Sequence, residues 1–203
     1  MTSSLVGSEM CIRDRQKNPG TAQERCGKHM KHCVHIYCGD GKGKTTAAAG
    51  LAARMAGYGK KVLFVQFFKG GETGEINLFL GLPQFQILRS EKPFPFTFQM
   101  DEAQKQELRE IHNGLLRQAL EQCRREAFGL AVLDEAFAAL QENLLDEALL
   151  QKFLSELRGR MEIVLTGRTP PKAYLDLADY VTEMTLRKHP YGQGLEARRG
   201  VEY

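Results

Sequence analysis

The residues best suited to chemistry form the run GDGKGKTT at residues 39–46. Glycines let a backbone turn its N–H groups toward an anion, and the start of a following helix adds a favourable dipole. In such a run Lys44 would contact phosphate oxygens, and Thr45 would place its hydroxyl on Mg²⁺. We expect the whole run to bind nucleotide phosphates: Gly39, Asp40, Gly41, Lys42, Gly43, Lys44, Thr45 and Thr46.

The run departs from the phosphate-loop pattern G-x-x-x-x-G-K-[ST]. Gly43, Lys44 and Thr45 fill the end of that pattern, but its first glycine falls on Cys38, and Gly39 comes one residue late. The loop is therefore one residue short, and we expect it to cradle phosphates differently. The alternative is a glycine-rich turn without a ligand, which the flanking strand-like and helix-like runs disfavour.

A second candidate is the carboxylate pair Asp134 and Glu135, which follows an apolar run at residues 130–133. The carboxyl end of a strand in a parallel sheet lies beside the phosphate loop. Mg²⁺ takes oxygen ligands and keeps phosphate oxygens and waters, so Thr45, Asp134 and Glu135 are the expected metal ligands. Taken alone, the carboxylates could instead cap a helix. A hydrolytic ATPase would use Glu135 to align water, whereas a group-transfer enzyme need not.

Strands and helices must position these residues, and the hydrophobic pattern predicts an alternation of the two. Apolar runs predict strands at residues 34–38, 61–67, 85–88, 130–133, 161–165 and 180–184. Helical spacing or composition predicts helices at residues 46–55, 101–126, 144–157 and 170–178. This alternation predicts an α/β fold, a three-layer P-loop NTPase-like (RecA-like) domain with a mostly parallel central sheet.

Length and composition narrow the class of protein. The 203 residues suit one domain, which we place at residues 32–203. Residues 1–31 lack clean periodicity, and we expect a disordered or non-native N-terminal extension there. A net charge of +3 is too mild to favour nucleic acid, and no run of 18 apolar residues predicts a membrane span. The odd number and irregular spacing of the five cysteines favour reduced thiols in the cytoplasm.

Residues 34–203 together resemble the P-loop family of ATP:corrinoid adenosyltransferases. The resemblance rests on several separate segments besides the phosphate loop. These are VQFFKG (65–70), LDE (133–135), TGR (166–168), DYVTEM (179–184), KHP (188–190) and GVEY (200–203). A generic P-loop ATPase would not share all of them.

The resemblance implies transfer of the 5′-deoxyadenosyl group of ATP to the Co(I) of a corrinoid, with release of triphosphate. The acceptor would be cob(I)alamin or cob(I)yrinic acid a,c-diamide, in adenosylcobalamin biosynthesis or salvage. Co(I) carries no proton, so no general base is needed. The protein must position C5′ and neutralise charge on the leaving triphosphate. Lys44, Mg²⁺ on Thr45 and Glu135, Lys42 and Arg168 are the candidates for this charge neutralisation.

The resemblance also implies a role for aromatic side chains in making Co(I). In the family they displace the lower axial ligand of the Co(II) corrinoid, which makes the metal easier to reduce. Phe96, Thr97 and Phe98 match the family's F-T-W segment, and Phe98 stands where the family has Trp. Phe98 keeps an apolar ring but lacks the indole N–H. The alternative is that Phe94, Phe96 and Phe98 form an alternating core strand.

The expected partners follow from the same resemblance: a corrinoid, a homodimeric second copy and, as a candidate, a flavoprotein-type reductant. We expect neither nucleic acid nor membrane as a partner. Two other function classes remain open. A P-loop kinase or ATPase of RecA-like type would release ADP and phosphate instead of triphosphate. A non-catalytic corrinoid carrier would retain Lys44 and Glu135 but form no Co–C bond.

Overall fold

The computed structural model describes residues 32–201. The predicted extension at residues 1–31 lies outside these described residues, and so do Cys11 and Cys26. Cys33, Cys38 and Cys123 lie within them as free thiols. Among the helices of residues 32–201, none combines the length and apolar character that crossing a membrane requires.

The centre of the domain is a six-stranded parallel sheet with the strand order β3-β2-β4-β5-β1-β6. The strands are β1 (Val34–Cys38), β2 (Val62–Gln66), β3 (Phe85–Arg89), β4 (Leu130–Asp134), β5 (Glu162–Thr166) and β6 (Tyr180–Glu183). All six were predicted to within one residue at each end. The parallel α/β class is therefore confirmed.

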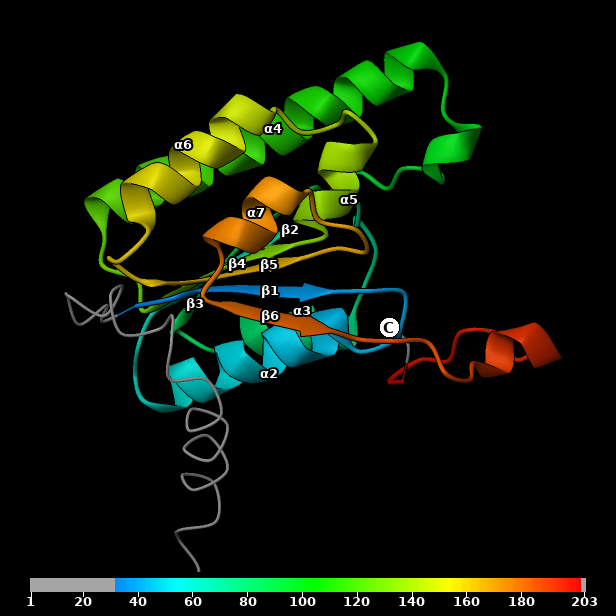
Figure 1. Cartoon of the computed structure of the whole chain (residues 1–203), viewed down its shortest axis with the longest axis horizontal. Helices are drawn as coiled ribbons and strands as arrows, with labels where there is room; N and C mark the ends of the chain where they lie inside the picture. Colours follow the sequence, from blue (N-terminus) through cyan, green and yellow to red (C-terminus); the bar gives the residue numbers. More distant parts are fainter. Residues whose placement is uncertain (1–31, 202–203) are drawn as a thin grey trace, which may run out of the picture. The chain divides into compact units, whose positions relative to one another are not determined.

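Helices cover both faces of this sheet (Figure 1). One face carries α2 (Lys44–Gly57) and α3 (Gly74–Leu80), and the other carries α4 (Glu102–Arg125), α5 (Ala136–Gln141), α6 (Glu147–Leu157) and α7 (Lys172–Leu177). Residues 32–201 also contain the short 3₁₀ helices η2 (Thr97–Gln99), just before α4, and η3 (Pro190–Gln193), in the segment after β6. The three predicted layers are thus present.

The core has two halves, one on each side of the sheet. Along β2, Val62 and Phe64 pack into the half beneath α2 and α3, whereas Leu63 and Val65 pack into the half beneath α4 and α6. Every residue of β2 is buried. A strand covered on both faces needs apolar residues at successive positions, which explains its unbroken hydrophobic run.

The helix boundaries follow local capping chemistry. Asp101 and Gln104 form a capping box at the start of α4, where each side chain bonds the backbone N–H of the other residue. α6 begins at Glu147, later than the predicted residue 144, because the side chain of Asp146 caps it by accepting from the Ala148 N–H. The short helices α3 and α5 were not predicted, since neither is long enough to show a helical period.

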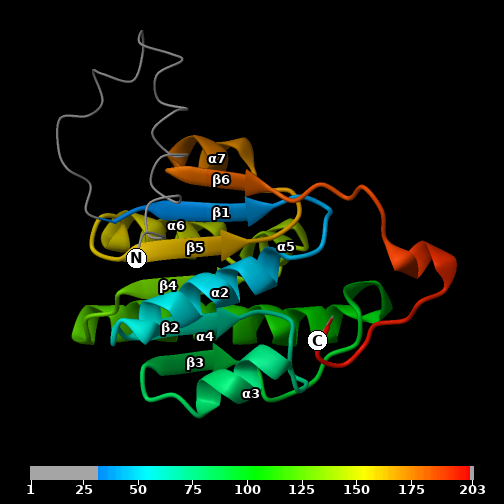
Figure 2. The same ribbon diagram turned by 90° about the horizontal axis from the view of Figure 1, so that it is seen from below.

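The alternative of an alternating core strand at Phe94, Phe96 and Phe98 is wrong. This segment is irregular and ends in η2. Phe96 and Phe98 are 72% and 81% exposed, and only Phe94 packs against core residues. After β6 the chain continues beyond the carboxyl ends of the strands, the same edge at which the loop between β1 and α2 lies (Figure 2).

Candidate active site

The loop between β1 and α2 encloses the amine of Lys44. Its Nζ donates to the carbonyl oxygens of Gly39 and Gly41, each at 2.8 Å. α2 begins at Lys44 with no side-chain cap and no acidic residue in its first turn. Its first N–H groups and the positive end of its dipole are therefore available to an anion.

Close packing against the end of β6 explains two of the loop glycines. Gly39 has a φ of 95°, and a Cβ there would lie 2.5 Å from the carbonyl oxygen of Met184. A Cβ on Gly41 would lie 2.6 Å from the same oxygen. The side chain of Asp40 accepts from the Leu186 N–H at 2.9 Å. The loop is thus fixed to the segment that follows β6.

Asp134, at the end of β4, is a fully buried carboxylate that joins three other elements. Its Oδ1 accepts from Thr45 Oγ1 at 2.9 Å and from Thr166 Oγ1 at 2.8 Å. Its Oδ2 accepts from Gln66 Nε2 at 3.3 Å and lies 3.7 Å from Lys69 Nζ. Asp134 is not among the residues that line the cavity described below, so it reaches that cavity through the Thr45 hydroxyl.

Glu135 follows Asp134, and its carboxylate interacts electrostatically with Lys44 of the phosphate loop. It precedes α5 with a φ of 63°, and its N–H donates to Thr166 Oγ1 at 2.8 Å. Burial and the neighbouring Asp134 raise the pKa of Glu135, while Lys69 and Lys44 oppose that shift. Burial lowers the pKa of Lys44, and Glu135 opposes this shift most.

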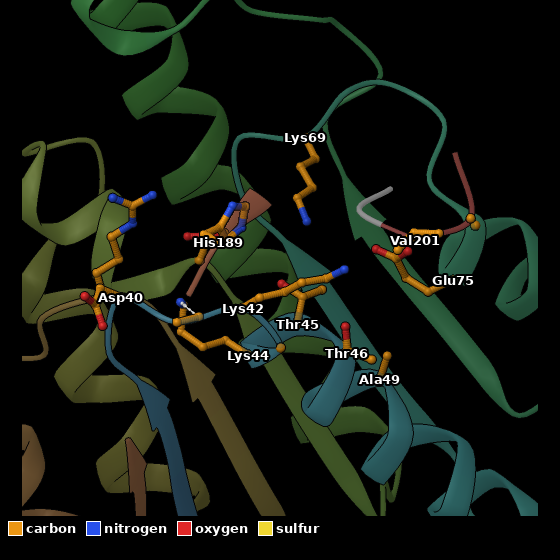
Figure 3. Close-up of a pocket in the computed structure, with 16 residues that line it drawn as sticks. Asp40, Lys42, Lys44, Thr45, Thr46, Ala49, Lys69, Glu75, His189 and Val201 are labelled. Atoms are coloured by element: carbon orange, nitrogen blue, oxygen red, sulfur yellow. Dashed lines mark hydrogen bonds between the residues drawn. The ribbon is translucent and has the colours of Figure 1, made fainter. Parts of the chain in front are cut away.

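The phosphate loop and Glu135 line a cavity of about 560 Å³ (Figure 3). Four cationic residues line it: Lys42, Lys44, Lys69 and Arg168. The predicted phosphate-binding residues other than Gly39 line it too, as does Glu135. Figure 3 shows Lys69 pointing down toward Lys42 and Thr45 from the top of the view, and His189 and Val201 contributed by the C-terminal segment.

Phe96 and Phe98 are the predicted catalytic residues that the structure does not bring to this cavity. Neither residue lines it. Their rings stack on each other with centroids 5.6 Å apart and planes 9° from parallel. They present a broad, exposed aromatic surface in the segment before α4.

Sequence reasoning missed Lys69, Gln66 and Thr166 as parts of the site. Gln66 and Thr166 are buried at the ends of β2 and β5, where their polar side chains meet Asp134. A polar residue that ends an apolar strand in a parallel sheet is a usable signal, because such ends meet at the ligand-binding edge. Lys69 follows β2 at the same edge. All three residues lie in segments that carry the family resemblance, VQFFKG (65–70) and TGR (166–168), but none was predicted as a site residue.

The cavity offers oxygen ligands of the kind that Mg²⁺ prefers. Thr45 and Glu135 both line it, and the Thr45 proton is engaged by Asp134, which leaves hydroxyl lone pairs for a cation. Within residues 32–201 no group of three or more His, Cys, Asp or Glu side chains could hold a metal ion. A cation here would depend on phosphate oxygens and waters, which is how Mg²⁺ binds with nucleotides.

A glycine-rich loop between the first strand and a helix, with a Thr–Asp pair at the neighbouring strand end, defines a P-loop nucleotide-binding protein. Residues 30–203 match the model of the family described as ATP:corrinoid adenosyltransferase BtuR/CobO/CobP. The chain belongs to this family.

Curated relatives agree with this assignment. A corrinoid adenosyltransferase of Pseudomonas aeruginosa is 33% identical over 172 residues, which cover 83% of this chain and 82% of the relative. One of Sinorhizobium sp is 36% identical, with coverage of 85% and 81%. One of Escherichia coli strain K12 is 33% identical, with coverage of 84% and 85%.

Proposed function

We propose that this chain transfers the 5′-deoxyadenosyl group of ATP to the Co(I) of a corrinoid. The Co–C5′ bond forms as the bond from C5′ to the triphosphate oxygen breaks, and triphosphate leaves with the bonding electrons. The observation that carries the proposal is the cavity, because four cationic residues line it, two from the phosphate loop and two from other segments. Family membership supports ATP and a corrinoid as the two substrates.

The protein's main contribution would be electrostatic. Lys44, inside the loop, and Lys69 and Arg168, on other sides of the cavity, can stabilise the negative charge that builds on the leaving triphosphate. Fixed charges of this kind act most strongly on groups where charge develops in the transition state. Co(I) is itself the nucleophile, so Glu135 need not act as a base.

Mg²⁺ would be held by Thr45 and Glu135 together with phosphate oxygens, and it would neutralise part of the triphosphate charge. Asp134 would contribute indirectly, because it fixes the rotamer of the Thr45 hydroxyl. We also propose that the triphosphate lies in the reverse direction from that in hydrolytic P-loop enzymes, with the ribose toward the corrinoid.

Phe96 and Phe98 would contact the corrinoid. Their exposed, stacked rings are suited to cover one face of a flat macrocycle, which fits displacement of a lower axial ligand of Co(II). A flavoprotein-type reductant would deliver the electron, a homodimer would be the assembled form, and the cytoplasm would be the compartment.

A kinase or ATPase of RecA-like type is not favoured, because the family and its curated relatives are corrinoid adenosyltransferases. One product assay tests the assignment. The protein is incubated with Mg-ATP and chemically reduced cob(I)alamin. We expect inorganic triphosphate in equal amount to a corrinoid with the visible spectrum of a Co–C bond. Release of ADP and phosphate without corrinoid would overturn the proposal.

A further inference from the structure

The turn that delivers Lys69 to the cavity has a strained backbone. β2 ends at Gln66, and the Phe67 N–H still donates to Asp134 O at 3.1 Å. The Lys69 N–H then donates to Phe67 O at 2.8 Å, and Phe68 between them has a φ of 63°. A three-residue turn with positive φ at a non-glycine centre is rare and strained. Such a turn persists only where its surroundings impose it.

His112, on α4, supplies a main constraint on this turn. Its side chain is fully buried, and Nε2 accepts from the Phe68 N–H at 3.1 Å. Nδ1 must then carry the proton, which it donates to Leu144 O at 3.1 Å. The rings of Phe67 and Phe68 meet the imidazole edge to face, with centroids at 5.1 and 4.8 Å. Burial lowers the pKa of His112 to about 4, so Nε2 stays an acceptor near neutral pH.

The turn is fixed from its other side as well. The guanidinium of Arg89, at the end of β3, donates to Lys69 O at 3.0 Å and to Gly71 O. A Cβ on Gly70 would lie 2.5 Å from Lys92 O, so the backbone of Gly70 packs closely against that of Lys92. The main chain of Lys69 is therefore held by groups that do not line the cavity, and its ammonium reaches the cavity 3.7 Å from Asp134.

We propose that His112 is a positioning residue for the reaction: it holds the strained turn at Phe68 and thereby aims Lys69 at the triphosphate. This inference rests on the proposed function in that it takes a triphosphate as the ligand of Lys69. His112 itself does not line the cavity. A histidine that served only the core would affect stability but leave ligand binding through Lys69 unchanged.

A double-mutant cycle between His112 and Lys69 separates these two roles. Binding of Mg-ATP and of inorganic tripolyphosphate is measured by calorimetry, and melting temperature is measured in parallel. His112→Phe keeps an aromatic ring but removes both hydrogen bonds. We expect this substitution to lower the affinity for each ligand about tenfold, which is the effect of losing one well-placed charged contact. Lys69→Ala should lower the affinity by a similar factor. The double variant should bind each ligand less than about twofold more weakly than Lys69→Ala does.

Two further variants serve as controls. Asn113→Ala removes the hydrogen bond to the Asp146 N–H, which also ties α4 to the loop before α6 but does not touch the turn. It should lower the melting temperature and leave ligand affinity within about twofold. His112→Gln can still accept from Phe68 and donate to Leu144, so it should restore most of the affinity. If His112→Phe does not fold, His112→Leu, which also removes both hydrogen bonds, replaces it in the cycle.

The outcomes are distinguishable. If the wild-type protein binds both ligands and the His112 variant only melts earlier, the positioning role is overturned while the proposed function stands. Full additivity of the His112 and Lys69 effects on affinity would also overturn the positioning role, because the two residues would then act independently. A wild-type protein that binds neither ligand would overturn the proposed function, and the inference with it.

Discussion

Thr45 and Thr166 offer a matched pair of substitutions at one buried carboxylate. Both hydroxyls donate to Oδ1 of Asp134, at 2.9 and 2.8 Å. Only Thr45 lines the cavity. Replacing either residue with valine removes one hydrogen bond to the same oxygen atom with little change in volume. The two variants therefore separate the stability of the Asp134 network from the chemistry of the cavity.

The expected losses of stability differ because the two hydroxyls have different second partners. Thr45→Val removes one hydrogen bond to a charged group, and Asp134 keeps Thr166 and Gln66, so about 1.5 kcal/mol should be lost. Thr166→Val also leaves the Glu135 N–H without its acceptor, which raises the loss to about 3 kcal/mol. At roughly 2–4 °C per kcal/mol, the melting temperatures should fall by about 3–6 and 6–12 °C.

Activity should follow the opposite order. Thr45→Val removes the hydroxyl that would hold Mg²⁺ beside the triphosphate, and we expect about a 100-fold loss in kcat/KM, typical of one lost transition-state contact. Thr166→Val should keep most activity at a temperature where it is folded. Adenosylation of chemically reduced corrinoid is followed spectroscopically across a Mg²⁺ titration, together with thermal melts. The wild-type protein should lose activity with a chelator and regain it with Mg²⁺.

The reasoning would be refuted if both valine variants, measured while folded, lost activity to the same extent. Catalysis would then depend on the integrity of the Asp134 network and not on a hydroxyl exposed to the cavity. If Thr45→Val required the same Mg²⁺ concentration as the wild-type protein, that result alone would show that Thr45 is not a metal ligand.

Three further predictions concern other parts of the site. Lys44→Ala should abolish adenosyl transfer, because the loop loses the charge at its centre; substantial residual turnover would count against the phosphate-loop role. Phe98→Ala should lower the rate with Co(II) corrinoid and a reductant more than with pre-reduced Co(I), and equal losses would remove its role in reduction. His112 is neutral when folded, with its pKa lowered from 6.5 to about 4, so the unfolded chain binds the extra proton first as pH falls. The free energy of unfolding of the wild-type protein should therefore fall by roughly 3 kcal/mol as the pH is lowered from 6.5 to about 4. Denaturant titrations of His112→Gln should not show this fall.

The sheet could be predicted from the sequence because buried parallel strands have a recognisable hydrophobic pattern. Each of the strands β1, β2, β4 and β5 is a short run of mainly apolar residues, since both of its faces are covered. α4 was predicted closely because its charged and apolar residues alternate with the helical period and Asp101 caps it. α3 and α5 show no recognisable helical pattern, because six or seven residues make fewer than two turns.

Most of the candidate site that could be predicted lies in short local runs of residues. The phosphate loop is such a run, and so is the Asp134–Glu135 pair. The partners of Asp134 are different, because Gln66 and Thr166 lie far away in the sequence and meet it only through the strand order. The γ-turn at Phe68 could not be foreseen, because the tertiary contact with His112 opposes the local preference of a phenylalanine.

The four side chains that meet Asp134 come from α2, β2, β5 and the turn after β2. Their convergence means that no fragment of the domain contains a finished nucleotide site, since removing any one of these elements leaves the buried carboxylate short of partners. A ligand that binds only the completed arrangement therefore raises the free energy of unfolding of the entire sheet. Nucleotide should therefore slow amide hydrogen exchange in β4 and β5 as well as in the phosphate loop.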